Sequence, residues 1–390
     1  MSKHILWIIA FLSIALIGDR LVGYIFSGIT QKSLFRYSRL YCGKPDSADI
    51  LFVGNSRGLT FYQPEVERIT GMKTFNVSYN GMPADLAKNL VFDYLERNPA
   101  PKLMIIDATI CDRENDALKS SFNLYTPYSH RLDTLIRGIH VPDKWSGSKI
   151  VLGGSMSHLY RFNTELFQRV LFHKNKTDAD MLIDRVITES AVNDTSMNSY
   201  QVRMFKNMVA DLKQMIDTAQ AHGVKVQLVL NPYYPPFADV VRDSFLSPLK
   251  SYVENATGLT IHDFSKSLTQ RDELGDYQHA NKKGSIHYMN ILKDNGIFNP
   301  ETNVMQFASS PTNNYIGTIP SSTPPVIVPE IKQENIIKLE VKPNTTVHLI
   351  KEMLSIPVPK MKKNNFITPV KKRKPANGEG KDWISVDTAF

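Results

Sequence analysis

The chain has 390 residues, enough for one large domain or two smaller ones, and 42% of them are hydrophobic. This content allows a packed core, whereas the slightly negative mean hydropathy excludes a transporter with many membrane spans. The net charge of +8 fits an anionic membrane or polymer as well as nucleic acid, but only one basic run occurs, Lys371–Lys374, so no nucleic-acid partner is expected.

The cysteine and histidine residues show no metal-binding pattern. Cys42 and Cys111 are the only cysteines, which excludes a disulfide framework and leaves open whether these two pair. The sequence predicts neither a metal nor a cofactor. Four histidines in the middle of the chain lack metal-ligand spacing: His130, His140, His158 and His173.

The N-terminus has the composition of a membrane segment. Ile5 to Ile17 is almost uninterrupted apolar sequence, and Leu21 to Phe26 continues it after Gly18-Asp19-Arg20. No small-residue cleavage site follows, and about 22 residues suffice to cross a bilayer as a helix. We predict a signal anchor over residues 1–28, with Asp19 and Arg20 reaching water at the interface and the rest of the protein outside the cytoplasm. A buried N-terminal helix is the alternative.

From Asp49 to about Gly296, short apolar runs alternate with helical patterns, which is typical of a doubly wound α/β domain. Strands are predicted at Ile50–Val53, Thr74–Ser78, Leu103–Asp107, Val224–Leu230 and Thr260–Phe264. Helices are predicted over residues 64–70, 83–98, 164–172, 200–222, 243–257 and 286–295.

Two segments depart from this alternation. Residues 111–198 are predicted to form an insertion, as a cap over the site or as a surface for a large substrate. Residues 299–390 are rich in proline and asparagine and contain the basic run. Such a segment buries too little apolar surface to offset its ordering entropy, so we expect a largely disordered tail after an α/β domain at 29–298.

Ser56 follows the first predicted strand, within Phe52-Val53-Gly54-Asn55-Ser56-Arg57. In an open α/β sheet, ligands bind just beyond the carboxyl ends of the strands. A serine there is a candidate nucleophile if a general base and oxyanion donors accompany it. Taken alone, such a serine is more often a helix cap.

Asp276 and His279 lie after the last predicted strand, in Asp276-Tyr277-Gln278-His279. A carboxylate three residues before an imidazole can hold the ring nitrogen that faces away from a nucleophile. The ring then takes the proton from Ser56 and returns it to the leaving group. Together the three residues predict acyl transfer through an acyl-serine.

The motifs resemble those of the SGNH (GDSL-like) superfamily, particularly its membrane-anchored bacterial branch. That branch includes polysaccharide O-acetyltransferase-like proteins and the D-alanyl lipoteichoic acid transfer protein. The matching blocks are Val53-Gly54-Asn55-Ser56-Arg57, Phe75-Asn76-Val77-Ser78-Tyr79-Asn80-Gly81 and the Asp276 to His279 stretch with Gly284. The resemblance implies a three-layer doubly wound sandwich with a mostly parallel sheet, and it makes the N–H of Gly81 an oxyanion donor.

The resemblance also implies partners. These are an envelope or exported polysaccharide as acceptor of acetyl groups, the membrane, and a membrane-bound protein as acyl donor. An esterase or deacetylase of the same fold is one alternative, and a non-catalytic glycan-binding or assembly protein is another. A triad alone does not separate transfer from hydrolysis, because both share every step up to the acyl-enzyme.

One departure from the family concerns the block after the third strand. The family has an asparagine there that completes the oxyanion hole, but this chain reads Ile105-Ile106-Asp107-Ala108-Thr109. An ionised Asp107 only accepts hydrogen bonds, so Thr109 is the candidate donor and Arg57 a candidate source of positive charge. Tyr233 and Tyr234 follow the fourth strand, and stacking on a sugar is expected for either, with loop rigidity as the alternative.

Overall fold

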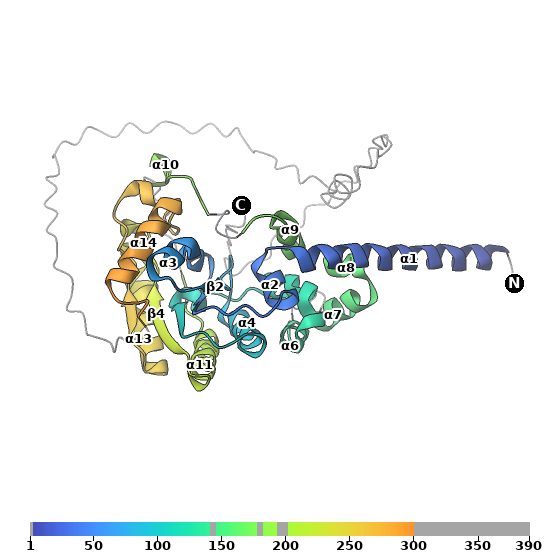
Figure 1. The fold of residues 1–390 in the computed structure, drawn as a ribbon, viewed down its shortest axis with the longest axis horizontal. Coiled ribbons are helices and arrows are strands. Elements are labelled where there is room, and N and C mark those ends of the chain that lie inside the picture. Colours follow the sequence, from blue (N-terminus) through green and yellow to red (C-terminus); the bar gives the residue numbers. More distant parts are fainter. Residues whose placement is uncertain (1–2, 141–145, 178–181, 193–201, 300–390) are drawn as a thin grey trace, which may run out of the picture. The chain divides into compact units, whose positions relative to one another are not determined.

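The computed structural model describes residues 3–140, 146–177, 182–192 and 202–299 (Figure 1). The chain divides into two units, Met1–Ile316 and Gly317–Phe390, and the second lies outside the described residues. The predicted tail from residue 300 onward, with its basic run, also lies outside them.

A five-stranded parallel sheet forms the centre of the first unit. The strand order is β2-β1-β3-β4-β5, and every neighbouring pair is parallel. Ile50 at the start of β1 is in register with Thr74 of β2 and Leu103 of β3. All five predicted strands occur, with β2, β4 and β5 shorter than expected: β1 Ile50–Val53, β2 Thr74–Asn76, β3 Leu103–Asp107, β4 Lys225–Leu230 and β5 Ile261–Asp263.

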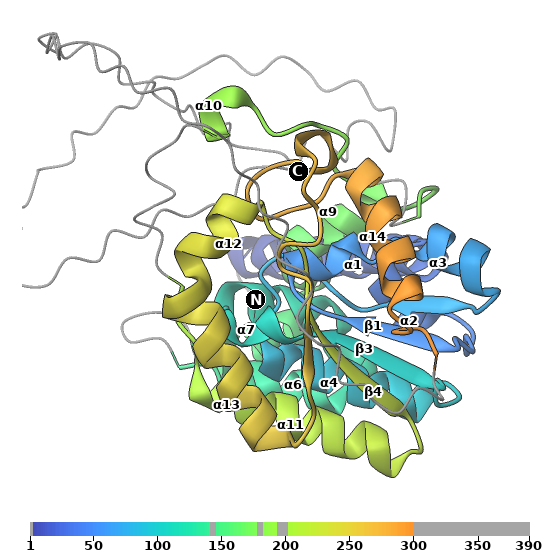
Figure 2. The same ribbon diagram turned by 90° about the vertical axis from the view of Figure 1, so that its left-hand side faces the viewer.

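Helices cover both faces of the sheet, so the predicted three-layer doubly wound α/β fold is confirmed (Figure 2). All four residues of β1 are buried. Because successive side chains of a strand point to opposite sides, both faces of the sheet are covered at β1. The helices on one face are α3 (Gln63–Thr70) and α14 (Lys282–Asp294), and those on the other are α4 (Ala84–Arg97), α11 (Lys206–Ala221) and α13 (Ser247–Thr257).

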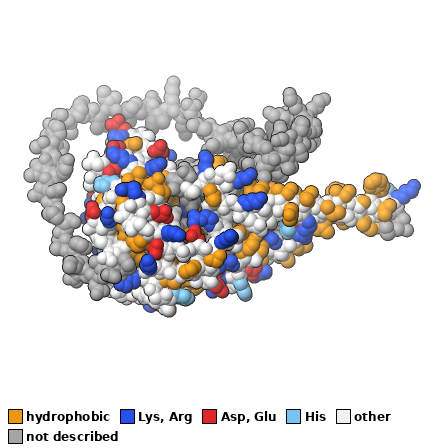
Figure 3. Space-filling view, in the orientation of Figure 1, with side chains coloured by type: hydrophobic (Ala, Val, Ile, Leu, Met, Phe, Trp, Pro, Cys, Tyr) orange, Lys and Arg blue, Asp and Glu red, His pale blue; other side chains and the backbone are white. Residues whose placement is uncertain are grey.

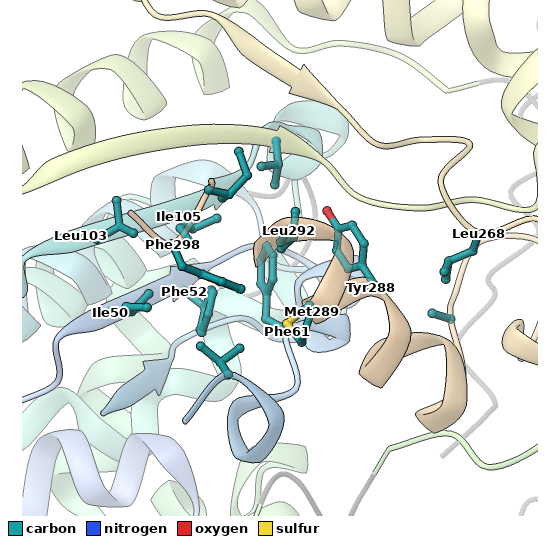
Figure 4. Close-up of a cluster of buried hydrophobic side chains, with 14 of the residues drawn as sticks. Ile50, Phe52, Phe61, Leu103, Ile105, Leu268, Tyr288, Met289, Leu292 and Phe298 are labelled. Carbon is teal, nitrogen blue, oxygen red and sulfur yellow. The ribbon is translucent and has the colours of Figure 1, made fainter. Parts of the chain in front are cut away.

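The core between the sheet and α14 is built from aromatic and aliphatic side chains (Figure 4). Phe52 of β1 and Phe61 stack with ring centroids 4.6 Å apart. Tyr288, Met289 and Leu292 of α14 are fully buried against them. This packing fixes α14, and therefore the loop before it, at the carboxyl end of the sheet.

Three predicted helices differ from the observed ones by more than one residue at one end. Helix α11 begins at Lys206 instead of residue 200, after the Phe205 N–H donates to the Cys111 carbonyl. Helix α14 begins four residues early because the side chain of Asn281 accepts the Gly284 N–H at 3.0 Å. Helix α13 is preceded by helix α12 (Pro235–Val241) and a π-helical turn (Arg242–Leu246).

The N-terminal helix α1 (Lys3–Lys32) is long and apolar enough to cross a membrane. It runs through Gly18-Asp19-Arg20 without a break, and helix α2 (Arg36–Cys42) follows after three residues. Asp19 was predicted to reach water, and this is wrong. The Asp19 side chain is buried against the start of helix α8 (His158–Phe162). Its carboxylate accepts hydrogen bonds from Ser157 Oγ (2.7 Å) and from the N–H groups of His158 (3.0 Å) and Leu159 (2.9 Å).

The segment after β3 is mostly helical. Its later helices contact α1 and one another, and α6 contacts α4. Cys42 and the buried Cys111 are free thiols. The helices of this segment in the described part of the chain are α5 (Asp116–Ser121), α6 (His130–Arg137), α7 (Gly147–Met156), α8 (His158–Phe162), α9 (Glu165–Phe172) and α10 (Glu189–Val192). The 3-10 turns among all the described residues are Ser56–Thr60, Ala108–Asp112, Phe122–Tyr128 and Arg271–Glu273.

Candidate active site

Ser56 begins a 3-10 turn immediately beyond β1. The side chain of Asn55 caps this turn by accepting the Arg57 N–H at 3.0 Å. Gly54 is required here, because a Cβ on it would lie 2.8 Å from the Gly58 Cα. Since β2 and β3 lie on opposite sides of β1, Ser56 also stands at the point where the strand order reverses, which is where open α/β sheets bind ligands.

His279 and Asp276 come to Ser56 from the loop before α14. The Nε2 of His279 lies 2.9 Å from Ser56 Oγ, and its Nδ1 lies 2.9 and 3.0 Å from the two carboxylate oxygens of Asp276. Asp276 Oδ1 also accepts the N–H groups of Gln278 (2.8 Å) and His279 (2.9 Å). The three predicted residues therefore form one hydrogen-bonded chain.

The environment of Asp276 favours its ionised form. Burial alone would raise its pKa, but the hydrogen bond and charge of His279, the Gln278 N–H and the Arg185 guanidinium hold the pKa below its ordinary value. Arg185 Nη2 lies 3.3 Å from Asp276 Oδ2. An ionised Asp276 can hold the His279 ring with its Nδ1 protonated and its Nε2 free to accept the Ser56 proton.

Residues 183–187, within the predicted insertion, run beside the loop that carries His279. The Lys282 N–H donates to the Ile183 carbonyl at 2.8 Å, and the Ile187 N–H donates to the Leu274 carbonyl at 2.8 Å. A Cβ on Gly275 would lie 2.6 Å from Ile183 Cγ2. This support was not predicted, and no local motif indicates it because the contact joins segments that are distant in the sequence.

Gly81 lies in the loop after β2, at the same edge of the sheet. Its φ is +64°, and the Met82 N–H donates to the Tyr79 carbonyl at 3.1 Å, closing a tight turn. Asn115 Nδ2 donates to the Gly81 carbonyl at 3.0 Å. Within the described part of the chain, neither the Ser56 N–H nor the Gly81 N–H donates a hydrogen bond.

Helix α2 fixes the loop that leads to Gly81. Tyr37 Oη donates to the Val77 carbonyl at 2.9 Å, and Arg36 Nη1 donates to the Ser78 carbonyl. Both side chains are buried. These two residues were not predicted, because nothing in the sequence of the short helix indicates a partner forty residues away.

Arg57 is not free to place charge on a substrate, contrary to its predicted role. Its side chain is 3% exposed, and Nη2 lies 2.8 Å from Asp112 Oδ2. Its guanidinium carbon also lies 5.0 Å from the centroid of the Tyr233 ring. Arg57 Nη1 lies 3.5 Å from Gln278 Oε1, so Arg57 also contacts the loop that carries His279.

The hydroxyl of Thr109 is also engaged in hydrogen bonds with other side chains. Its hydroxyl donates to Asp107 Oδ1 at 2.7 Å and accepts from Arg57 Nε at 2.9 Å. Burial raises the pKa of Asp107, against the opposing effects of Arg57 and Thr109. Because the single proton of the hydroxyl is used by Asp107, Thr109 cannot donate to an oxyanion, and that prediction is corrected.

The two tyrosines after β4 differ in exposure. Tyr233 is 2% exposed and lies between Arg57 and Phe237, so it has no face for a sugar, and the stacking prediction is corrected for it. Tyr234 is half-buried, and its N–H donates to the Tyr277 carbonyl at 3.0 Å. Tyr234 therefore borders the loop that carries Asp276 and His279.

No group of three or more metal-binding side chains occurs among residues 3–140, 146–177, 182–192 and 202–299. The groups that converge at this site are the serine hydroxyl, the imidazole and the carboxylate.

Comparisons with known proteins give matches among solved structures. No protein-family model matches the chain, and no curated protein sequence does. Similar solved structures include a GDSL-like lipase from Bacteroides thetaiotaomicron (10% identity, 63% of this chain and 86% of the lipase, TM-score 0.31). Others are TesA (11%, 63% and 97%, 0.31) and a psychrotrophic esterase from Pseudoalteromonas sp. (12%, 63% and 95%, 0.28).

Proposed function

We propose that the protein is a serine enzyme of acyl transfer. Ser56 Oγ attacks the carbonyl carbon of an ester as His279 Nε2 takes the hydroxyl proton. His279 then gives this proton to the leaving alcohol, and an acyl-Ser56 remains. Water or an acceptor hydroxyl next loses its proton to His279 and attacks the acyl carbon, after which Ser56 recovers its proton.

The observation that carries the proposal is the continuous contact from Ser56 to Asp276. Its two links measure 2.9 Å from serine to imidazole and 2.9 Å from imidazole to carboxylate. Both lie within the range that proton transfer requires. Asp276 is assigned the role of holding the ring and stabilising the imidazolium that forms.

The oxyanion donors in this proposal are the N–H groups of Ser56 and Gly81. Both groups lack a hydrogen-bond acceptor among the described residues, which leaves them available to a substrate. Thr109 and Arg57 are engaged elsewhere and do not add a third donor. A missing donor costs about 3 kcal/mol of transition-state stabilisation, so activated acyl donors should be much better substrates than ordinary esters.

The finer proposal is O-acetylation of an envelope or exported polysaccharide, with hydrolysis of acetyl esters as the alternative. The resemblance of the three motif blocks to the membrane-anchored acyltransferases supports it. Helix α1, acting as an uncleaved anchor with the folded domain outside the cytoplasm, fits the same role because envelope glycans and membrane-bound acyl donors lie there.

The full chain in detergent micelles, incubated with an aryl acetate, tests the proposal. Acetate released only in the presence of Ser56 supports the enzymatic function. Acetyl groups found on an added oligosaccharide support transfer, and release of acetate alone supports hydrolysis. If Ser56→Ala leaves the cellular phenotype intact, the protein is instead a non-catalytic glycan-binding or assembly protein.

A further inference from the structure

Exposed apolar side chains outside α1 concentrate on elements next to α1. On α7, Leu152 and Met156 are 55% and 66% exposed, and Met156 also contacts α1 through its carbonyl, which accepts from Arg20 Nη2 at 3.1 Å. In the rest of the described chain, only Val186 and Tyr252 are large, hydrophobic and exposed. The others near α1 are Leu159 and Tyr160 on α8, Phe172 at the end of α9, and Leu34 just after α1.

The uncharged apolar run of α1 that precedes Asp19 is shorter than a bilayer is thick. Residues 5–18 form about 21 Å of helix at 1.5 Å per residue, whereas a hydrocarbon core is about 30 Å thick. If α1 crosses the membrane, as the proposed function requires, the bilayer must extend past Asp19. At that level α1 is covered by α8 on one side. Figure 3 shows that most side chains on the surface of the projecting helix α1 are hydrophobic.

Asp19, which lies at this level, has hydrogen-bond partners that would satisfy its carboxylate inside a lipid environment. Asp19 accepts three hydrogen bonds from the start of α8, given above, and lies 3.7 Å from Arg20. Charged groups within a membrane are tolerated when they pair with one another or with the backbone.

Basic residues mark where the lipid headgroups would lie. Lys32 at the end of α1 is exposed, as are Lys174 and Lys176 after α9. The Leu34 N–H donates to the His173 carbonyl at 3.0 Å, which brings these segments together. Lysines at a membrane surface attract anionic lipid headgroups.

We propose that the α7–α8 hairpin, residues 147–162, is a membrane-embedded element. Its exposed apolar side chains enter the leaflet next to the folded domain, beside α1, with Lys32, Lys174 and Lys176 at headgroup level. The occupant of this surface is lipid, and the proposal rests on α1 acting as a membrane anchor.

Tryptophan fluorescence of the full chain in lipid nanodiscs tests this proposal. The three natural tryptophans, Trp7, Trp145 and Trp383, are replaced by phenylalanine. Leu159→Trp then reports on the hairpin, and Tyr252→Trp, an exposed apolar position on α13, is the matched control. A third chain keeps only Trp7 and reports on α1. Lipids brominated close to the headgroup quench tryptophans that lie in the bilayer.

The expected result is about twofold quenching of Leu159→Trp, as for a side chain buried at the headgroup and acyl boundary, with no quenching of Tyr252→Trp. Leu152→Trp should behave like Leu159→Trp and provides a second position if one variant fails to fold. If Trp7 is quenched while neither Leu159→Trp nor Leu152→Trp is, the hairpin proposal is overturned, the surface is assigned to a protein contact and the anchor remains intact. Unquenched Trp7, in a chain that does not sediment with membranes, would overturn the anchor itself.

Discussion

Ser56 and His279 are 223 residues apart in the chain, yet Ser56 Oγ lies 2.9 Å from His279 Nε2. Their contact depends on two parts of the fold. Gly54 lets the chain turn tightly after β1, and the core beneath α14 fixes the loop that precedes it. Each part can be tested separately from the chemistry.

Ser56→Ala should reduce the rate of aryl acetate hydrolysis by about 10⁴-fold or more, because no acyl-enzyme can form. Its melting temperature in detergent should stay close to that of the natural protein. Ser251→Ala, at an exposed position on α13, is the control and should keep full activity. Equal activity of both variants would exclude Ser56 as the nucleophile.

Asp276→Asn should lower kcat by about 10⁴-fold while substrate binding persists, because an amide no longer favours the ring form with Nε2 free. Steady-state kinetics with the aryl acetate measure this. Asp272→Asn is a matched control, since Asp272 lies four residues earlier and pairs with Lys283 on the surface at 2.5 Å. A small loss for Asp276→Asn would show that another group orients His279.

Gly81→Ala should lower both stability and activity. The left-handed backbone at Gly81 costs about 1–2 kcal/mol for a residue with a Cβ, and that Cβ would lie 2.7 Å from Asn115 Nδ2. Gly71→Ala is the control, because Gly71 has a φ of +70° and no atom within 4 Å of its added Cβ. Denaturant unfolding should show a loss for both variants, at least as large for Gly81→Ala, and kcat/KM should fall only for Gly81→Ala. A Gly81→Ala variant with unchanged kcat/KM would contradict the oxyanion role.

Asp112→Asn should destabilise the protein in a pH-dependent way. Burial opposes ionisation of Asp112, but the charges of Arg113 and Arg57 outweigh it and lower the pKa of the carboxyl. Its ionised form therefore stabilises the fold above the ordinary pKa of about 3.9, and this contribution is lost as the pH falls through the lower folded-state value.

At pH 7 the cost of Asp112→Asn should be about 3 kcal/mol, since Arg57 loses a buried partner. The difference from the natural protein should shrink as the pH falls below about 4. Urea unfolding of the full chain in detergent at several pH values measures both. Asp217→Asn, which breaks an exposed pair with Lys213, should cost no more than about 0.5 kcal/mol, and an equal cost for both would contradict the network.

Much of the fold was predictable because its signals are local. The strands at Ile50–Val53 and Leu103–Asp107 are short runs of apolar residues bounded by polar ones, and both occur with the predicted limits. The convergence of Ser56 and His279 was predictable because parallel strands place their following loops at one edge.

The residues around the site were less predictable because burial depends on contacts between distant segments. Arg57 and Thr109 follow strands as ligand-binding residues do, but the sequence does not show that Asp107 and Asp112 take up their hydrogen bonds. Tyr233 resembles an exposed loop aromatic until Arg57 and Phe237 cover it. Asp19 was assigned to water because its partners lie about 140 residues later.

Only three residues join α1 to α2, and α2 holds the backbone of the loop that leads to Gly81. A catalytic domain on a long flexible tether can sweep a wide volume of the space outside the cell membrane. If α1 is the membrane anchor proposed above, so short a connection would keep the crevice of the domain at a nearly constant height and tilt. Its substrates would then have to reach it by diffusing along the bilayer or by being handed over by a neighbour in the same membrane.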